Sequence, residues 1–477
     1  MPDGGETAPP DEREGYVMLI APFATNGVPR GPVRLFFFHP RVAQHDSFAA
    51  RAAEATRPTA WRRVRPTKSA RVAGYMYPDA ADEKRTAFRR EEKRYQLRRD
   101  QTFLTRRNRR VGGPLVTRRT CVADALDSRD LRFVAEAGGG EHGVRAVALA
   151  DADRADRESH AGADPNRRAP REAYALACRP GFFIFPGALD VETQREWLAA
   201  AVTKLCEPPA ETNHDAAHGP IEGLWDAATG DANERWLHPA SDVGATRASR
   251  WSRSPPANVA SSDATRREAS SLLRRLRWAT LGPKYDWTSR TYRTDEESPC
   301  SDVPNDIRAR CETLARVAHF VAAAEEAKER GTRTSSPPPP PPPPPRFRFG
   351  AGLVNYYRSG DALAGHVDDA ERDLTKPIVS FSLGSPCVFL LGGDTRDEAP
   401  TPLILRSGDA VVLSRESRRQ FHGVPRIFVA RENVADARGE ILEAPREVGD
   451  PECWTERPEV ARYVAGGRVN VSVRDID

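Results

Sequence analysis

From residue 347 onward, short apolar runs follow one another, separated by turn residues. This pattern predicts a series of strands at 347–357, 378–383, 387–391, 402–405, 410–413, 420–424 and 467–474. Their length and spacing are typical of an antiparallel double-stranded β-helix, a relative of the jelly roll. Residues 427–460 are expected to be an insertion before the last strand, anchored by Trp454 and Tyr463.

Polar and apolar residues alternate strictly in the last predicted strand. Arg468, Asn470, Ser472 and Arg474 alternate with valines at 469, 471 and 473. Side chains two residues apart share one face of a strand, so both arginines lie on one face. Burying that face is costly unless an anion is bound there, and arginine suits a bidentate grip on a carboxylate. The alternative is an edge strand whose charged face is solvated.

Three residues between these strands could hold a metal ion. His366 and Asp368 are two residues apart, which suits a strand end or the turn after it, and His422 would come from a distant strand. Two imidazoles and one carboxylate form the facial triad that binds non-haem Fe(II). On their own, such pairs also occur by chance on surfaces, and the same residues could bind catalytic zinc.

Two residues of the first predicted strand also indicate a site that binds a carboxylate. Asn355 and Tyr357 share one face and could donate hydrogen bonds toward a carboxylate. The alternative for the tyrosines is core packing with a satisfied hydroxyl.

The chain upstream contains helices, one further strand and long polar stretches. A buried strand is expected at 181–186, a helix capped by Asp190 that runs to residue 205, and helices at 88–95 and 304–330. Strands could also lie at 16–20 and 33–38. The nine prolines at 337–345 are expected in a surface loop, where they are either a tolerated expansion or a ligand for a polyproline-binding partner.

Aromatic and basic residues are interleaved between 274 and 292. The aromatic residues Trp278, Tyr285, Trp287 and Tyr292 alternate with several arginines and a lysine. Aromatic planes beside cations can stack on an unpaired base and bind its phosphates. Core packing is the alternative for both tryptophans.

Composition and charge bear on the number of domains and on the kind of partner. The chain has 477 residues, 39% of them hydrophobic, with 41 prolines, 34 glycines and a net charge of +4. Its length suits two or three domains, and a large share should not be packed core. Basic residues crowd between Arg30 and Arg71 and again between Arg85 and Arg119, which indicates a nucleic-acid partner or a general arginine-rich drift.

Cysteine usage and the absence of targeting signals bear on the compartment. Seven cysteines are scattered without a Cys-x-x-Cys pair, which favours reduced intracellular thiols. No apolar run is long enough for a membrane span, and the first residues resemble neither a secretory signal nor an organelle transit peptide. We expect an intracellular protein of the nucleus or cytoplasm, with mitochondrion or plastid left open.

Taken in order, these motifs resemble the AlkB family of Fe(II)/2-oxoglutarate dioxygenases, in the branch of its first homologue. The motifs that carry the resemblance lie at 179–187, 273–282, 285–287, 355–357, 366–368, 376–382, 389–393, 396–401, 407–409, 417–418, 422–426 and 468–474. They cover about the C-terminal 300 residues, and 88–95 is weakly similar to the branch's N-terminal helix.

The resemblance implies an α+β fold with a mainly β jelly-roll core, flanking helices and a nucleotide-recognition lid. It implies an N-terminal extension over 1–135, a linker over 136–172 and an oxygenase domain over 173–477, with insertions at about 207–265, 331–345 and 427–460.

The resemblance also implies the site. The cofactors would be Fe(II), 2-oxoglutarate and O2. His366, Asp368 and His422 would be catalytic metal ligands, and Asn355, Tyr357, Arg468, Asn470 and Arg474 would bind 2-oxoglutarate. Trp278, Tyr285 and Trp287 would contact the substrate.

The implied reaction is demethylation of a base in nucleic acid, flipped out or single-stranded, by a monomer. It releases succinate, CO2 and formaldehyde. Methyladenosine or methylcytosine in tRNA is favoured, with N6-methyladenine in DNA as the other choice. One departure matters: bacterial AlkB has a substrate-contacting aspartate where this chain has Ala370.

Three alternatives stay open at this point. A protein demethylase or hydroxylase would share the chemistry but would not need the aromatic lid. A zinc hydrolase would leave Arg468 and Arg474 without a purpose. A non-catalytic RNA-binding module is disfavoured because no metal ligand is missing.

Overall fold

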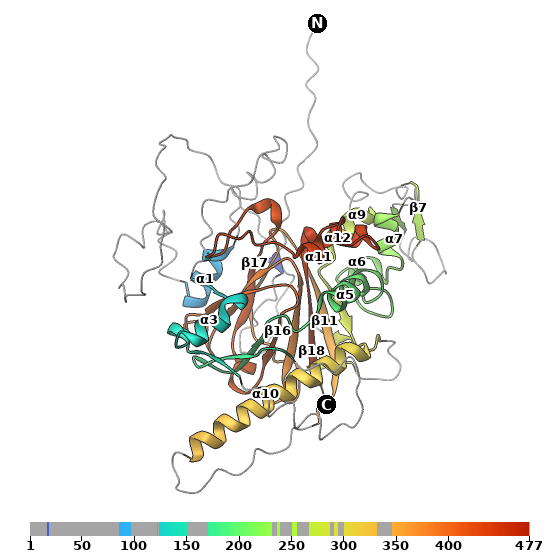
Figure 1. The fold of residues 1–477 in the computed structure, drawn as a ribbon. Coiled ribbons are helices and arrows are strands. Elements are labelled where there is room, and N and C mark those ends of the chain that lie inside the picture. The colour runs from blue at the N-terminus through green and yellow to red at the C-terminus, as the bar shows by residue number, and fades with distance from the viewer. Residues whose placement is uncertain are drawn as a thin grey trace, which may run out of the picture. The chain divides into compact units, whose positions relative to one another are not determined.

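A computed structural model gives the fold (Figure 1). It describes residues 17–18, 85–96, 122, 124–147, 149, 170–230, 236–238, 250–254, 267–286, 291–293, 300–331 and 346–476. Trp287, the polyproline stretch and the possible strand at 33–38 lie outside these residues.

Two large sheets form the centre of the structure. The eight-stranded sheet is antiparallel throughout, in the order β3 (Val144–Ala146), β4 (Tyr174–Leu176), β5 (Arg179–Phe185), β16 (Ala410–Leu413), β13 (Ile378–Gly384), β18 (Gly467–Asp475), β11 (Phe349–Arg358) and β8 (Trp278–Leu281). The six-stranded sheet has the order β1 (Val17–Met18), β12 (Ala362–His366), β17 (His422–Ile427), β14 (Cys387–Leu391), β15 (Thr401–Leu405) and β2 (Leu126–Asp127). Its two edge strands run parallel to their neighbours, β1 to β12 and β2 to β15.

The inner faces of the two sheets pack together. One buried cluster takes Phe182 and Leu413 from the larger sheet, and Phe389, Leu405 and Val424 from the smaller. Phe182 stacks on Phe389 with ring centroids 6.1 Å apart. The expected mainly β, jelly-roll type of α+β fold is therefore confirmed.

Helices cover the outer face of the larger sheet. The helix α5 (Val191–Thr203) begins at Asp190, whose side chain accepts a hydrogen bond from the Thr193 amide at 2.9 Å. The long helix α10 (Asn305–Gly331) lies across the same sheet in Figure 1. The valines of β18 join their buried cluster, so this strand is apolar on its helix side.

A short helix from the N-terminal part of the chain covers the smaller sheet. Phe88 and Tyr95 of α1 (Ala87–Tyr95) pack with Val388, Leu390 and Ile404. The residues adjacent to these three in β14 and β15 are on the opposite face of the sheet and belong to the cluster between the two sheets. Strand alternation thus divides one run of apolar residues between two cores.

The remaining elements are short. The helices are α3 (Leu131–Glu136), α6 (Asp215–His218), α7 (Leu224–Thr229), α9 (Ala269–Arg275), α11 (Arg446–Gly449) and α12 (Pro458–Ala465). The 3₁₀ turns are η1 (Ser128–Asp130), η2 (Gly140–His142), η5 (Arg415–Arg419) and η6 (Ala430–Glu432). Two small ribbons pair β6 (Trp236–His238) with β7 (Arg250–Ser252) and β9 (Tyr285–Asp286) with β10 (Thr291–Tyr292).

The observed elements stay close to the predicted ones. Every strand expected from residue 347 onward is present, with ends shifted by no more than about three residues, and α1, α5 and α10 occupy the predicted helices. β12 was not predicted, because Ala362–His366 is short and contains a glycine. The range 136–172 includes β3, which is the edge strand of the larger sheet. The domain boundaries themselves stay a prediction.

Two general properties of the described residues agree with the sequence. No helix among them is long and apolar enough to cross a membrane. Their six cysteines are all free thiols.

Candidate active site

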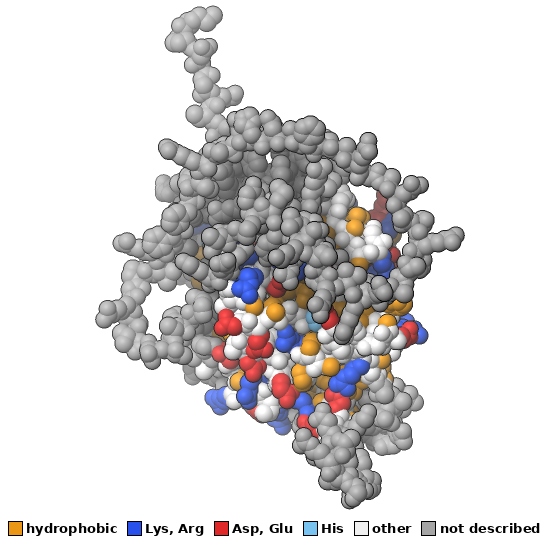
Figure 2. Space-filling view, turned by 90° about the vertical axis from the view of Figure 1, so that its left-hand side faces the viewer, with side chains coloured by type: hydrophobic (Ala, Val, Ile, Leu, Met, Phe, Trp, Pro, Cys, Tyr) orange, Lys and Arg blue, Asp and Glu red, His pale blue; other side chains and the backbone are white. Residues whose placement is uncertain are grey.

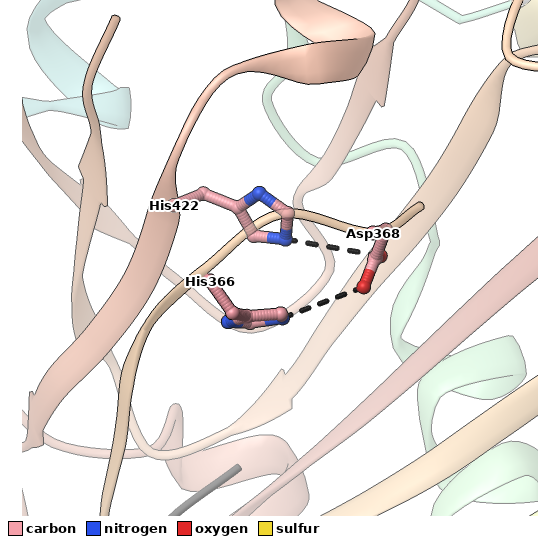
Figure 3. Close-up of side chains that lie close together, drawn as sticks. All are labelled: His366, Asp368 and His422. Atoms are coloured by element: carbon pink, nitrogen blue, oxygen red, sulfur yellow. Dashed lines mark ion pairs between the residues drawn. The ribbon is translucent and has the colours of Figure 1, made fainter. Parts of the chain in front are cut away.

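The three proposed metal ligands meet where two strands of the smaller sheet pair. His366 is the last residue of β12 and pairs with His422, the first residue of β17. Asp368 follows β12 directly and turns toward both rings (Figure 3). Its oxygens lie 3.4 Å from Nε2 of His366 and 3.8 Å from Nε2 of His422.

The backbone holds both imidazoles by their far nitrogens. Nδ1 of His366 lies 3.0 Å from the carbonyl oxygen of Ala364, and Nδ1 of His422 lies 3.2 Å from that of Gln420. A carbonyl can only accept, so each Nδ1 carries the proton and each Nε2 lone pair faces the centre. This arrangement is typical of metal-binding histidines.

The donor set and its spacing fit a metal ion. Bond lengths of about 2.1 Å at right angles place neighbouring ligand atoms about 3 Å apart. The ligand atoms of the three residues all lie within 4.8 Å of one another. Three such ligands on one face of an Fe(II) ion would leave further coordination positions for a co-substrate.

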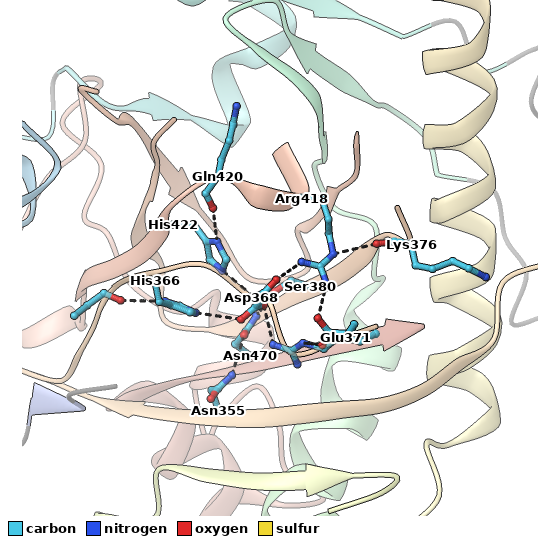
Figure 4. Close-up of polar contacts among 12 residues, drawn as sticks. Asn355, His366, Asp368, Glu371, Lys376, Ser380, Arg418, Gln420, His422 and Asn470 are labelled. Atoms are coloured by element: carbon cyan, nitrogen blue, oxygen red, sulfur yellow. Dashed lines mark hydrogen bonds and ion pairs between the residues drawn. The ribbon is translucent and has the colours of Figure 1, made fainter. Parts of the chain in front are cut away.

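The carboxylate is held by a buried charge network (Figure 4). Arg474 donates to Asp368 at 2.8 Å and lies 3.1 Å from Glu371, which also pairs with Arg418. Arg418 in turn donates to the backbone carbonyls of Asp368 and Lys376. The loop that carries Asp368 is therefore fixed at both its side chain and its backbone.

This network sets the charge of the metal carboxylate. Burial by itself would raise the pKa of Asp368, but the guanidinium of Arg474 outweighs it and holds the pKa well below its usual range. Burial, together with the neighbouring His366, lowers the pKa of His422 to about 4. At neutral pH the site therefore offers one carboxylate and one neutral imidazole from these two residues.

A second arginine on β18 faces the same cavity and carries free donors. Arg468 is 3% exposed and donates to the Ser382 hydroxyl at 3.0 Å. Its Nε and Nη1 atoms have no hydrogen-bond partner among the described residues. Buried N–H groups without a partner are costly, so this geometry favours an anion that accepts from two of them.

The predicted co-substrate residues surround this arginine. The Arg468 guanidinium lies 5.2 Å from the ring centre of Tyr357, and burial raises the pKa of that phenol to about 12. Tyr357 thus stays protonated and can donate. Asn470 is anchored to the Ser380 hydroxyl at 2.7 Å and accepts from Asn355 at 3.4 Å.

The structure brings eight predicted site residues to one cavity. They are Asn355, Tyr357, His366, Asp368, His422, Arg468, Asn470 and Arg474. The polar face of β18 thus points inward, because all nine residues of this central strand are buried. The alternative of a solvated edge strand is wrong.

The predicted substrate residues lie on other elements. Trp278 is on β8, opposite Asn355 in the larger sheet, and Tyr285 stacks edge-to-face on Tyr292 at 5.3 Å. The Tyr292 hydroxyl donates to Glu371 at 3.0 Å, which ties this ribbon to the charge network. Ala370 lies half-buried between Asp368 and Glu371. On the described part of the face in Figure 2, acidic and basic side chains are interspersed.

Sequence reasoning assigned no role to several residues that hold the site. They are Glu371, which pairs with Arg418, and the two arginines Arg418 and Arg396, which bind the backbone beside the metal ligands. Both arginines lie in motifs that carry the family resemblance, but the sequence offered no reason to assign them a role. Only their recurrence in those motifs could have singled them out. Nothing local in the sequence marks Glu371.

Comparison with known proteins settles the family. The family profile described as "2OG-Fe(II) oxygenase superfamily" matches residues 233–474, half of the chain. The "DNA N(6)-methyladenine demethylase ALKBH1A" of Arabidopsis thaliana is 32% identical over 403 residues, which are 83% of this chain and 97% of that protein.

The chain belongs to the 2OG-Fe(II) oxygenase superfamily. It is a dioxygenase that uses Fe(II), 2-oxoglutarate and O2, and its similarities fall in the AlkB-like branch that the motifs predicted. The "Nucleic acid dioxygenase ALKBH1" of Homo sapiens is 31% identical over 64% of this oxygenase and 66% of that protein. The "tRNA demethylase abh1" of Schizosaccharomyces pombe is 36% identical over 32% of this oxygenase and 43% of that protein.

Proposed function

We propose that this oxygenase removes a methyl group from a nitrogen of a nucleic-acid base, with methyladenosine or methylcytosine in tRNA as the first candidate. The observation that carries the proposal is the pairing of the His-Asp-His cluster with a buried, partly unpaired arginine in one cavity. The names of the similar proteins, which act on DNA or tRNA, support nucleic acid as the substrate class.

Each residue has a stated task in this proposal. His366, Asp368 and His422 would hold Fe(II), and Arg468 would bind the far carboxylate of 2-oxoglutarate, with Tyr357 as a further donor. Arg474 keeps Asp368 ionised and directed at the metal. When bound, the iron with 2-oxoglutarate and O2 supplies the oxidation that hydroxylates the methyl carbon. The product then loses formaldehyde.

The protein's part is to orient the base and to keep water out. Trp278 and Tyr285 would contact the base, and Trp287, which lies outside the described residues, stays a prediction for the same role. A base in a duplex would have to be flipped out to reach the cavity. Ala370 lacks the carboxylate that bacterial AlkB has there, which argues against simple transfer of the bacterial specificity.

N6-methyladenine in DNA is the second candidate. It is favoured by the relative that matches over 97% of its length, which is named a DNA N6-methyladenine demethylase. A protein substrate has no comparable observation in its favour. The monomeric state, a polyproline-binding partner and the nuclear, cytoplasmic or organellar address also stay predictions.

The test uses the full chain, purified anaerobically and loaded with Fe(II). It is given 2-oxoglutarate, O2 and either total tRNA or single-stranded DNA with N6-methyladenine. Succinate, formaldehyde and the nucleoside profile are followed by mass spectrometry. We expect a methylated nucleoside to disappear from tRNA in step with succinate, and His366→Ala to abolish both while it still binds tRNA.

Other outcomes decide between the candidates. Loss of methyl from DNA alone would replace tRNA by the second candidate. Succinate formed without any change in either nucleic acid would contradict the substrate class but keep the oxygenase. Unchanged demethylation by His366→Ala would refute the metal ligands.

A further inference from the structure

A carboxylate from the N-terminal helix reaches the strand of the first metal histidine. Glu92 of α1 is 1% exposed, and its Oε1 accepts from the Gly365 amide at 2.6 Å, across 273 residues of sequence. Its other oxygen accepts from Arg89 at 2.7 Å. Burying a carboxylate charge is costly, so the burial of Glu92 against a backbone N–H calls for a functional explanation.

Close packing fixes this contact. The Phe88 ring lies so near Gly365 that a side chain at that glycine would begin 2.3 Å from it. The same ring leaves only 2.8 Å for a side chain at Gly392. Arg396 donates to the Gly365 carbonyl at 2.6 Å, and the Phe88 amide donates to the Arg396 carbonyl at 2.9 Å. The helix therefore packs on the strand of His366 at Gly365 and on the end of β14 at Gly392.

The Glu92 contact continues through one peptide unit to the imidazole. The bond between Ala364 and Gly365 presents an N–H to Glu92 and a C=O to Nδ1 of His366. A negative acceptor on the N–H polarises the whole unit, which makes the carbonyl a stronger acceptor. A stronger acceptor at Nδ1 orients the ring and makes Nε2 more basic toward a metal.

The second histidine provides an internal reference. Its Nδ1 faces the Gln420 carbonyl, and the N–H of that same peptide unit, on Phe421, donates to the Gly393 carbonyl at 2.9 Å. The two relays have the same form, but a carboxylate ends one and a neutral carbonyl ends the other.

We infer that Glu92 is a positioning residue of the metal centre, which acts on His366 through the Ala364–Gly365 peptide unit. The helix α1 is then a part of the oxygenase site and more than a cover on the smaller sheet. The inference rests on the metal ligands of the proposed function, and it is independent of the substrate.

The test measures metal affinity without nucleic acid. Co(II) replaces Fe(II) as an air-stable probe, and its binding is followed by absorption in the full chain and in Glu92→Gln and Glu92→Asp. The first variant keeps an acceptor oxygen but removes the charge, whereas the second keeps the charge but withdraws it from Gly365. We expect both to weaken Co(II) binding by about 10-fold, as loss of outer-shell partners does.

A neighbouring glutamate is the matched control. Glu91 is on the same helix, partly exposed and paired with Arg94, so Glu91→Gln changes the charge alone and should leave Co(II) affinity unchanged. The melting temperature of the metal-free proteins is measured alongside, and a variant that does not fold is replaced by the other.

Two results would overturn the inference. One is unchanged Co(II) affinity in both Glu92 variants, even with a lowered melting temperature, because Glu92 would then be structural only. The other is an equal loss in Glu91→Gln, which would trace the effect to the charge of the helix. Neither result bears on which nucleic acid is the substrate.

Discussion

The two sides of the metal site are held in different ways, one by ion pairs between side chains and the other by packing and by side chains that bind the backbone. On the carboxylate side, Asp368 lies in a buried network with Arg474, Glu371 and Arg418. On the histidine side, the strand of His366 is held at one residue, Gly365, where the Phe88 ring packs and where Glu92 and Arg396 bind the backbone.

The difference follows from what each ligand requires. A carboxylate must stay ionised in a buried place, and only nearby cations can offset its lost hydration. A neutral imidazole needs a fixed ring orientation and one acceptor, and here a backbone carbonyl is that acceptor, with Glu92 bound to the same peptide unit. We therefore expect mutations on the two sides to fail in different ways.

The largest effect should come from breaking the charge network. Glu371→Ala leaves Arg418 and Arg474 buried without their shared partner, which should lower the free energy of unfolding by about 3–5 kcal/mol. Urea denaturation of the metal-free protein measures it. The double variant Glu371→Met with Arg418→Met should lose less, because it removes opposite charges together. An equal or larger loss in the double variant would show that the network's charge balance is not what matters.

On the histidine side the largest cost should be a cavity. Phe88→Ala empties the space over Gly365 and Gly392, and should lower the free energy of unfolding by about 3 kcal/mol. Phe133→Ala is the control, since that ring is 64% exposed and its loss should cost less than about 0.5 kcal/mol. Similar costs for both rings would mean that α1 does not pack as described.

Replacement of Arg468 should weaken the binding of 2-oxoglutarate without lowering the free energy of unfolding. Arg468→Met removes the free donors, so the KM for 2-oxoglutarate should rise about 30-fold, equivalent to about 2 kcal/mol of charged hydrogen bonding. The free energy of unfolding without 2-oxoglutarate should not fall, because the buried charge that is removed has two guanidinium nitrogens without a hydrogen-bond partner among the described residues. Steady-state succinate formation and urea denaturation test the two halves. An unchanged KM would refute the assigned role.

The smallest effect should be at the link to the β9–β10 ribbon. Tyr292→Phe deletes one hydrogen bond to Glu371 and should lower the free energy of unfolding by about 1 kcal/mol. The network around Asp368 keeps its arginines, so the KM for 2-oxoglutarate should stay within about twofold. A large rise in that KM would mean that the ribbon controls the co-substrate site.

The same contrast explains what could be predicted from the sequence. The inward face of β18 was predictable because its polar residues alternate with valines, and the triad was predictable because few residue types bind iron. Glu92 and Glu371 were not, because each acquires its role from partners that the fold brings together over long sequence separations. Period and composition describe a residue's own element, and they carry no information about such partners.

The alternation in β18 also limits where the chain can accept an insertion or a deletion. The strand lies between β11 and β13, with arginines toward the cavity and valines toward the helices. Inserting or deleting one residue within it would reverse both faces, so that valines would line the cavity and two guanidinium groups would enter the apolar core. A change of length before Gly467, in the connection that contains α11 and α12, leaves the alternation intact, because the shift is absorbed before the strand begins.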